Sequence, residues 1–351
     1  MFGLYRTLLA LLVVGHHLTG STLPGGQYAV HGFFILSGYL MTLIMHESYG
    51  YTASGRLAFA GNRALRLYPS WFVVVLLAAL ILSLFAGPPF RASMDIPQSL
   101  SGWVQNLTLV FADPMPNQVR PRLSPATWAL TIELFYYALI CFGISRSRLS
   151  TWIWFALGAA YHLAIAILGA RHGYAYFHIL SGSLPFSIGA LMFHYRFKLP
   201  AWPGWLVAIG GTLLVMQLSR GSVFAPTFYA NLIVNAAIVA LLIHATGDRN
   251  RDRLVGDFSY HIYILHWPVA LAVYTWMGYS GPDPAMPPLF LTVLACLLIS
   301  LALTRLVDRP VERWRKRLRD SEKLEEPQTE CELSRPIIGH ARPSAIRPEE
   351  P

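Results

Sequence analysis

Charged residues are scarce in this chain. They make up 13% of its 351 residues, against about 25% in a typical soluble domain. Hydrophobic residues make up 54%, and the mean hydropathy is +0.45. This balance excludes an ordinary soluble protein and predicts an all-α polytopic membrane protein. Cysteine is also rare: Cys141 and Cys296 lie in apolar runs and Cys331 near the end of the chain. Neither a disulfide framework nor a metal site is therefore expected.

Two further signals are missing from the sequence. The first apolar run ends at His17 without a small-x-small cleavage site, and the apolar pattern resumes at once, so a removed signal peptide is not expected. No internal repeat is visible, which weakens the case for a transporter built from inverted halves.

Ten spanning helices are expected when about 20 apolar residues are required for each crossing. They cover residues 4–20, 28–46, 67–87, 124–144, 151–170, 177–195, 201–219, 226–246, 257–277 and 287–307. The segment 97–112 is too short and polar to count, and is expected to be re-entrant or interfacial. The membrane domain would occupy residues 1–315. Residues 320–351, rich in Glu, Pro and Arg, are expected to form a disordered cytoplasmic tail.

Basic residues predict that both termini face the cytoplasm. With that orientation the inner loops hold twice as many Lys and Arg residues as the outer loops, and a basic tail follows, as the positive-inside rule requires. The net charge of +9 then reflects membrane orientation, and no nucleic-acid partner is expected. The inner set is Arg56, Arg63, Arg66, Arg146, Arg148, Arg196, Lys198, Arg249, Arg251 and Arg253, and the outer set is Arg91, Arg120, Arg122, Arg171 and Arg220.

The first expected helix carries Arg6 and His17 on one face. Eleven residues separate them, which places them within about 20° around the helix and about 16 Å apart along it. His16 points about 100° away from His17. Ionisable groups inside a membrane span usually mark a functional pathway.

Arginines and a carboxylate mark the third and fourth spans. Arg63 and Arg66 are three residues apart and therefore share a helical face. Their guanidiniums suit phosphate or carboxylate, although arginines at a cytoplasmic boundary can also serve only as topology anchors. Glu133 lies well inside the fourth span, where a carboxylate must be paired or protonated. Its candidate partners are Arg6, His17 and His266.

Further polar residues lie in the ninth and second spans. Ser259, Tyr263 and His266 share one face by their spacing of four and three. His31 at the outer end of the second span could contact a polar acceptor, whereas Gly32, Ser37 and Gly38 permit close helix packing. A histidine in a span can simply bond to a neighbouring carbonyl. Polar stripes in four separate helices nevertheless favour one shared interior site.

In their order along the chain, these stretches resemble the acyltransferase-3 family of integral membrane acyltransferases over residues 1 to about 315. The resemblance rests on Arg6 followed by His17, the run Phe33-Phe34-Ile35-Leu36-Ser37-Gly38-Tyr39, Arg63-Ala64-Leu65-Arg66, the stretch from Trp128 to Glu133, and the run Ser259-Tyr260-His261-Ile262-Tyr263-Ile264-Leu265-His266-Trp267-Pro268. Each motif is weak alone, but the ordered set is specific.

The resemblance implies transfer of an acyl group, acetyl being the expected one, from acyl-CoA to a hydroxyl of a saccharide or glycolipid. Acyl-CoA would be a co-substrate, with no bound cofactor and no metal. Such transfer needs a base for the alcohol and stabilisation of the oxyanion. We assign the base to His17, with His16 as the weaker candidate, and expect Glu133 to orient it.

Further roles follow from the same resemblance. Arg63 and Arg66 would bind the donor phosphates on the cytoplasmic side. Arg6 would extend this cationic path and polarise the carbonyl, while the acceptor would enter from the outer side. The shared cavity is expected to include His266, His16, His31, Ser37, Trp128 and Tyr263.

Two positions depart from the family pattern. Many members have an aspartate where this chain has His31, which puts any role of that acid in doubt here. Members often end the last span with Glu before a basic residue and Pro, whereas this chain has Asp308-Arg309-Pro310. Some subgroups carry a fused esterase-like domain, and this chain is expected to be the stand-alone membrane form in a bacterial inner membrane.

Two alternatives remain open from the sequence. A proton-coupled transporter or permease could use His17, Glu133 and His266 as a relay, although Arg63 and Arg66 suit a phosphate-bearing donor better than a proton path. An inactive relative with a sensing or assembly role is the other alternative.

Overall fold

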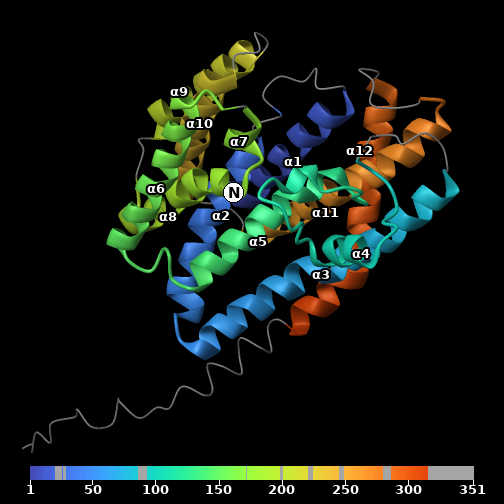
Figure 1. The fold of residues 1–351 in the computed structure, drawn as a ribbon, viewed down its shortest axis with the longest axis horizontal. Helices are drawn as coiled ribbons and strands as arrows, with labels where there is room; N and C mark the ends of the chain where they lie inside the picture. The colour runs from blue at the N-terminus through green and yellow to red at the C-terminus, as the bar shows by residue number, and fades with distance from the viewer. Residues whose placement is uncertain are drawn as a thin grey trace, which may run out of the picture.

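A computed structural model describes residues 1–19, 26, 29–85, 93–170, 172–197, 201–219, 224–244, 249–279 and 286–314. Over these residues the chain is a bundle of helices without a β-strand (Figure 1). One isolated bridge pairs Met94 with Arg122. The expected all-α class is therefore confirmed. The expected tail at 320–351 lies outside the described residues.

Twelve α-helices follow one another along the described residues. In Figure 1, α6, α8, α9 and α10 lie on one side of the bundle and α3, α4 and α12 on the other, with α1, α5 and α11 between them. Their bounds are α1 Phe2–Leu18, α2 Ala29–Ile44, α3 Ala53–Leu84, α4 Leu100–Thr108, α5 Trp128–Cys141, α6 Arg148–Ile167, α7 His172–Tyr176, α8 Ser183–Tyr195, α9 Ala201–Ser219, α10 Phe224–His244, α11 Arg249–Trp276 and α12 Met286–Leu303. Single π-helical turns extend α2 over Met45–Tyr49 and α12 over Thr304–Asp308.

Five helical segments among the described residues are long and apolar enough to cross a membrane. They are Ala29–Tyr49, Ala53–Leu84, Arg148–Ile167, Thr227–His244 and Pro287–Trp314. Shorter apolar helices cover Phe2–Leu18, Pro125–Cys141, Ile179–Tyr195 and Trp202–Val215. A helix coincides with each of the ten expected spans. That all ten cross the membrane, and that both termini face the cytoplasm, remain predictions.

The start of α3 differs from the expected one. The helix begins at Ala53, well before residue 67, because the Thr52 side chain caps it by accepting a hydrogen bond from the Gly55 N–H at 3.1 Å. Arg63 and Arg66 consequently lie inside a long helix instead of at its start. The segment 97–112 holds the short helix α4, whose first turn is capped by Ser99.

Helix α1 packs parallel to α11 along most of its length. The two helices approach so closely that a Cβ on Gly3 would lie 1.7 Å from the carbonyl oxygen of Asp252. The Asp252 carboxylate accepts hydrogen bonds from the N–H groups of Gly3 (3.0 Å) and Leu4 (3.1 Å). These bonds satisfy donors that a helix start leaves open and fix the register of α1 against α11. That register decides which polar residues of the two helices meet.

Helices α2 and α8 form the other close pair, and they run antiparallel. A Cβ on Gly38 would lie 2.1 Å from the carbonyl oxygen of Phe186, and one on Gly189 would lie 2.0 Å from that of Ile35. Only glycine permits this approach, so the packing role expected for Gly38 is confirmed.

Candidate active site

The register of α1 and α11 brings His17 and His266 into contact. His17 Nδ1 lies 3.0 Å from His266 Nε2, and the two rings stack with centroids 5.2 Å apart. His266 is fully buried, and its Nδ1 lies 2.8 Å from the carbonyl oxygen of Tyr263, one turn earlier in α11. The structure therefore brings together two of the histidines that the sequence singled out.

For two rings in the neutral state, this chain of contacts determines the tautomers. The Tyr263 carbonyl can only accept, so His266 Nδ1 carries the hydrogen and donates it. The acceptor atom of His266 is then Nε2, and His17 Nδ1 donates to it. His17 consequently has its lone pair on Nε2, as a general base requires.

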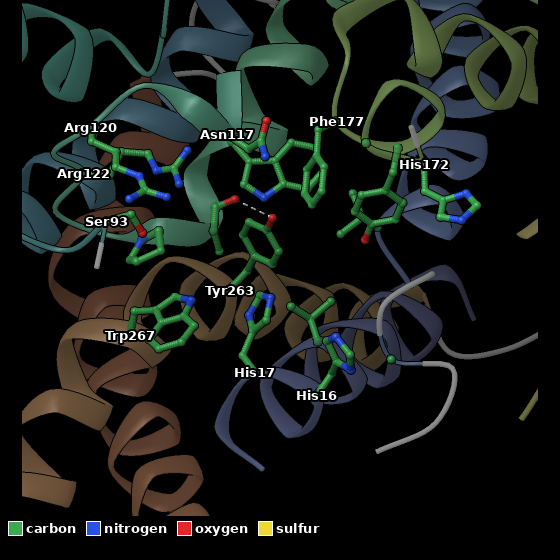
Figure 2. A pocket seen from close by; sticks show the side chains of 18 residues that line it. His16, His17, Ser93, Asn117, Arg120, Arg122, His172, Phe177, Tyr263 and Trp267 are labelled. Atoms are coloured by element: carbon green, nitrogen blue, oxygen red, sulfur yellow. Dashed lines mark hydrogen bonds between the residues drawn. The ribbon is translucent and has the colours of Figure 1, made fainter. Parts of the chain in front are cut away.

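A cavity of about 380 Å³ lies beside this pair (Figure 2). None of the described residues that line it is an Asp or Glu, whereas its wall holds three histidines and two arginines. Aromatic rings form much of the remaining wall. The lining residues include His16, His17, His172, Arg120, Arg122, Ser93, Asn117, Trp128, Tyr176, Phe177, Tyr263 and Trp267.

Three of the expected cavity residues lie in this wall with His17. His16 is its neighbour in sequence, with ring centroids 5.9 Å apart. It lines the same cavity although adjacent side chains point about 100° apart around a helix. Trp128 stands at the start of α5. Tyr263 is held in place by its hydroxyl, which donates to the Ala126 carbonyl at 2.7 Å, as the dashed line in Figure 2 shows.

Glu133 belongs to a second polar cluster, away from this cavity. Its carboxylate accepts hydrogen bonds from the Ser37 hydroxyl at 2.8 Å and from the Tyr137 hydroxyl. A small cavity of about 40 Å³ beside it is lined by three arginines in addition to Glu133, Ser37 and Tyr137. These arginines are Arg6, Arg63 and Arg66. The expected partnership of Glu133 with Arg6 is thus compatible with the geometry, and Ser37 takes a place beside Glu133.

Each of the two α3 arginines that line this small cavity is held by neighbouring groups. Arg66 forms an ion pair with Asp257 at the start of α11, with 2.7 Å between Nη2 and Oδ1. Arg63 Nη2 donates to the Asn62 side chain at 2.9 Å, and its guanidinium lies 5.9 Å from the centroid of the Phe59 ring. Both side chains reach the small cavity, as their shared helical face predicts.

The two clusters are joined by a third cavity of about 40 Å³. Its lining includes Arg6 and Glu133 from the arginine cluster, and Val30 and Tyr263 from the wall of the large cavity. A line of cavities therefore leads from Arg63 and Arg66 past Arg6 and Glu133 to His17.

This arrangement separates residues that sequence reasoning had combined. Glu133 lines the two small cavities and His17 the large one. His266, and not Glu133, is the residue in hydrogen-bond contact with the His17 ring. Arg6 likewise lies about three turns of α1 before His17, roughly 16 Å along the helix. The geometry therefore supports Arg6 as part of the path, and gives no support for its polarising a carbonyl at His17.

His31 lies outside the large cavity. Its side chain is fully buried and is enclosed by the rings of Phe34, Tyr176 and Phe228, with centroids 4.7 to 5.5 Å away. Neither ring nitrogen has a hydrogen-bond partner among the described residues. Tyr176 separates it from the cavity, so the structure gives no support for direct contact with an acceptor.

Several residues of these clusters escaped sequence reasoning. Arg120 and Arg122 counted there only as outer-loop charges, and Trp267 only as part of a motif. Asp257 directly precedes the motif of α11, but nothing in the sequence paired it with Arg66. Tyr137 lies four residues after Glu133, a helical spacing that could have identified it.

The comparisons with known proteins identify the family of this chain. The acyltransferase-3 family model, described as an acyltransferase domain, matches residues 3–305. The chain is also similar to the peptidoglycan O-acetyltransferase OatA of Listeria monocytogenes, at 24% identity over 354 residues. That alignment covers 88% of this chain and 55% of the relative, so the chain spans about half the length of that relative. No solved structure matches the chain. The family match covers every residue of the candidate site, and the chain belongs to the acyltransferase-3 family of membrane O-acyltransferases.

Proposed function

We propose that the protein transfers an acyl group, acetyl in the first instance, from acyl-CoA to a hydroxyl of a saccharide or glycolipid. The observation that carries the proposal is the line of cavities between the arginine cluster and the His17–His266 pair. It connects a site suited to the donor phosphates with a base suited to a hydroxyl. The relative's name gives acetyl as the transferred group and peptidoglycan as the acceptor of that protein.

The orientation follows the distribution of Lys and Arg in the sequence. With the N-terminus in the cytoplasm, Arg63 and Arg66 face the compartment that supplies acyl-CoA. His17 then lies toward the outer face, where the acceptor enters the large cavity. The acyl-bearing arm of the donor would extend along the cavities past Arg6 and Glu133. The chain would act in the inner membrane of a bacterium.

His17 performs the central step in this proposal. Its Nε2 takes the proton of the acceptor hydroxyl while the hydroxyl oxygen attacks the carbonyl carbon of the thioester. The new C–O bond forms, the oxyanion collapses and the C–S bond breaks. The CoA thiolate leaves and receives the proton from the imidazolium. His266 accepts from His17 Nδ1 throughout and keeps Nε2 directed to the hydroxyl. Donors in the cavity wall stabilise the oxyanion. Trp267 packs on the His17 ring, with ring centroids 5.3 Å apart.

The test measures acetyl-CoA turnover by purified protein in detergent, with surface glycans of producing cells as acceptors. His17→Gln should lower kcat about 10²- to 10⁴-fold, the usual contribution of a general base. Arg63→Gln should raise KM for acetyl-CoA about tenfold, because a hydrogen bond from a cation to phosphate is lost. Arg148→Gln is the control, since Arg148 lies outside these cavities. Full activity of His17→Gln would refute the assignment of the base, and absence of any transfer by wild type would refute the function.

The transporter reading is not favoured by the family match. It would require protein-dependent uptake of a solute driven by a proton gradient in vesicles. Such uptake, in the absence of acetyl-CoA turnover, would replace the acyltransferase proposal.

A further inference from the structure

The large cavity meets the third cavity at one point of its wall. Among the described residues, Val30 and Tyr263 are the two that line both cavities. Val30 lies in the first turn of α2, and Tyr263 lies in α11, one turn before His266. Because His266 contacts His17 at 3.0 Å, this meeting point lies close to the proposed base. We call the passage between Val30 and Tyr263 the neck.

Both sides of the neck are held in place. The Tyr263 hydroxyl donates to the Ala126 carbonyl at 2.7 Å, the bond drawn in Figure 2. The Phe33 ring also meets the Tyr263 ring edge-on, with centroids 6.1 Å apart. Val30 is a buried β-branched residue within a helix, where one side-chain rotamer is strongly preferred. Neither side chain can therefore turn aside without losing packing or a hydrogen bond.

The third cavity, on the donor side of the neck, has room for only a small group. Its volume is about 40 Å³, which holds about three water molecules when each needs about 10–15 Å³. An acetyl group has the same number of non-hydrogen atoms, two carbons and one oxygen. The large cavity beyond the neck, at about 380 Å³, is far roomier. Selection of the acyl group by its size is therefore expected at the neck and not beside His17.

Under the proposed function, the acyl group passes the neck ahead of the arm that carries it. The donor phosphates bind at Arg63 and Arg66, so the thioester reaches His17 when the arm extends through the two small cavities. The thiol end of that arm is a linear chain of methylene and amide groups, and a linear acyl group has a similar cross-section. A branch on the carbon beside the carbonyl widens the acyl group, and no bond rotation narrows it again. The neck consequently separates acyl groups by width more than by length.

We propose that Val30 and Tyr263 determine the acyl specificity of the protein, by admitting acetyl and other narrow acyl groups and excluding branched and aromatic ones. This inference rests on the proposed function and adds the class of acyl group. The test changes Val30, because its side chain has no hydrogen bond to lose, whereas that of Tyr263 has one. Removing the two methyl groups of Val30 should widen the neck and leave the hydrogen bond of Tyr263 in place.

The experiment compares butyryl-CoA with isobutyryl-CoA, two donors that have the same atoms but different widths. Transfer is measured with purified protein in detergent, with surface glycans of producing cells as acceptors and acetyl-CoA as the reference donor. Wild type should have a kcat/KM for butyryl-CoA about tenfold or more above that for isobutyryl-CoA, the usual discrimination for one misfitting methyl group in an apolar site. Val30→Ala should reduce this preference about tenfold. Because both donors are compared within one variant, the ratio does not depend on the amount of folded protein.

Two further variants complete the test. Val13→Ala is the matched control, because Val13 is also a buried valine but lines the large cavity and neither of the small ones. It should leave the preference between the two donors unchanged. Val30→Leu is the reverse test, since its longer side chain should narrow the neck and lower kcat/KM for acetyl-CoA itself about tenfold. This value is measured on monodisperse protein, and it decides the matter even where wild type uses neither four-carbon donor.

Four outcomes would overturn the inference. Equal kcat/KM of wild type for butyryl-CoA and isobutyryl-CoA would show that the neck does not select by width. A preference that Val30→Ala leaves unchanged, or that Val13→Ala reduces equally, would place the selection elsewhere. Wild-type kinetics of Val30→Leu with acetyl-CoA would show that the donor does not pass the neck. These three results leave the proposed function intact, whereas absence of acetyl-CoA turnover by wild type would refute the function and the inference together.

Discussion

Replacing His266 tests whether it holds His17 in its productive state. His266→Leu fills a similar space but has no atom to accept the hydrogen of His17 Nδ1. A hydrogen bond between neutral groups contributes about 0.5–1.5 kcal/mol, and loss of about 1.4 kcal/mol from transition-state stabilisation lowers the rate tenfold. The buried N–H left without an acceptor would also favour the other tautomer or ring orientation of His17, at a similar cost. We expect kcat to fall about 10- to 100-fold, less than for loss of the base itself.

The assay includes a variant that restores the acceptor. The amide oxygen of Gln can accept from His17 Nδ1, so His266→Gln should recover most of the activity that His266→Leu loses. KM for acetyl-CoA should stay unchanged in both. His162→Leu is the matched control, because His162 is also a buried histidine but lies outside the cavity. A structural role alone would give both His266 variants the same loss and a lowered thermal midpoint. Wild-type kcat for His266→Leu would refute the positioning role.

Two further predictions concern the surroundings of the site. Asp252→Ala removes the acceptor of two N–H groups at the start of α1, and should lower the free energy of unfolding by about 0.5–2 kcal/mol, measured by thermal unfolding in detergent with Asp95→Ala as control. Tyr137→Phe removes one of the two hydroxyls that donate to Glu133, and should lower stability by about 1 kcal/mol while raising KM for acetyl-CoA. A change in kcat alone would contradict the place of Tyr137 in the donor cluster.

The helices and their polar faces were predictable because membrane burial imposes a strong pattern on sequence. Ten apolar segments coincide with helices, and the spacing of Arg63 and Arg66 put them correctly on one face. The start of α3 was missed because its first turns, before residue 67, are amphiphilic. They do not meet the criterion of about 20 apolar residues for each membrane crossing. The Thr52 cap that begins the helix is a local signal, which an approach based on apolar runs overlooks.

The pairing of site residues was less predictable, because it depends on register between helices that are distant in sequence. The sequence placed His17, Glu133 and His266 in one interior, but the pairing of His17 with His266 depends on the contact of Gly3 with the start of α11. That register brings His17 to His266. Glu133 instead accepts hydrogen bonds from Ser37 and Tyr137. Arg122 could not be identified at all, since its position depends on backbone bonds between two loops.

Arginines lie at both ends of the line of cavities, and an imidazole pair lies between them. At the donor end three arginines face one carboxylate in the cavity wall, Glu133, and Asp257 pairs with one of the three. At the other end, Arg120 and Arg122 line the large cavity. Between these ends lies the His17–His266 pair. Because desolvated cations are costly without partners, the donor end, with three arginines in its wall, is suited to an anionic substrate.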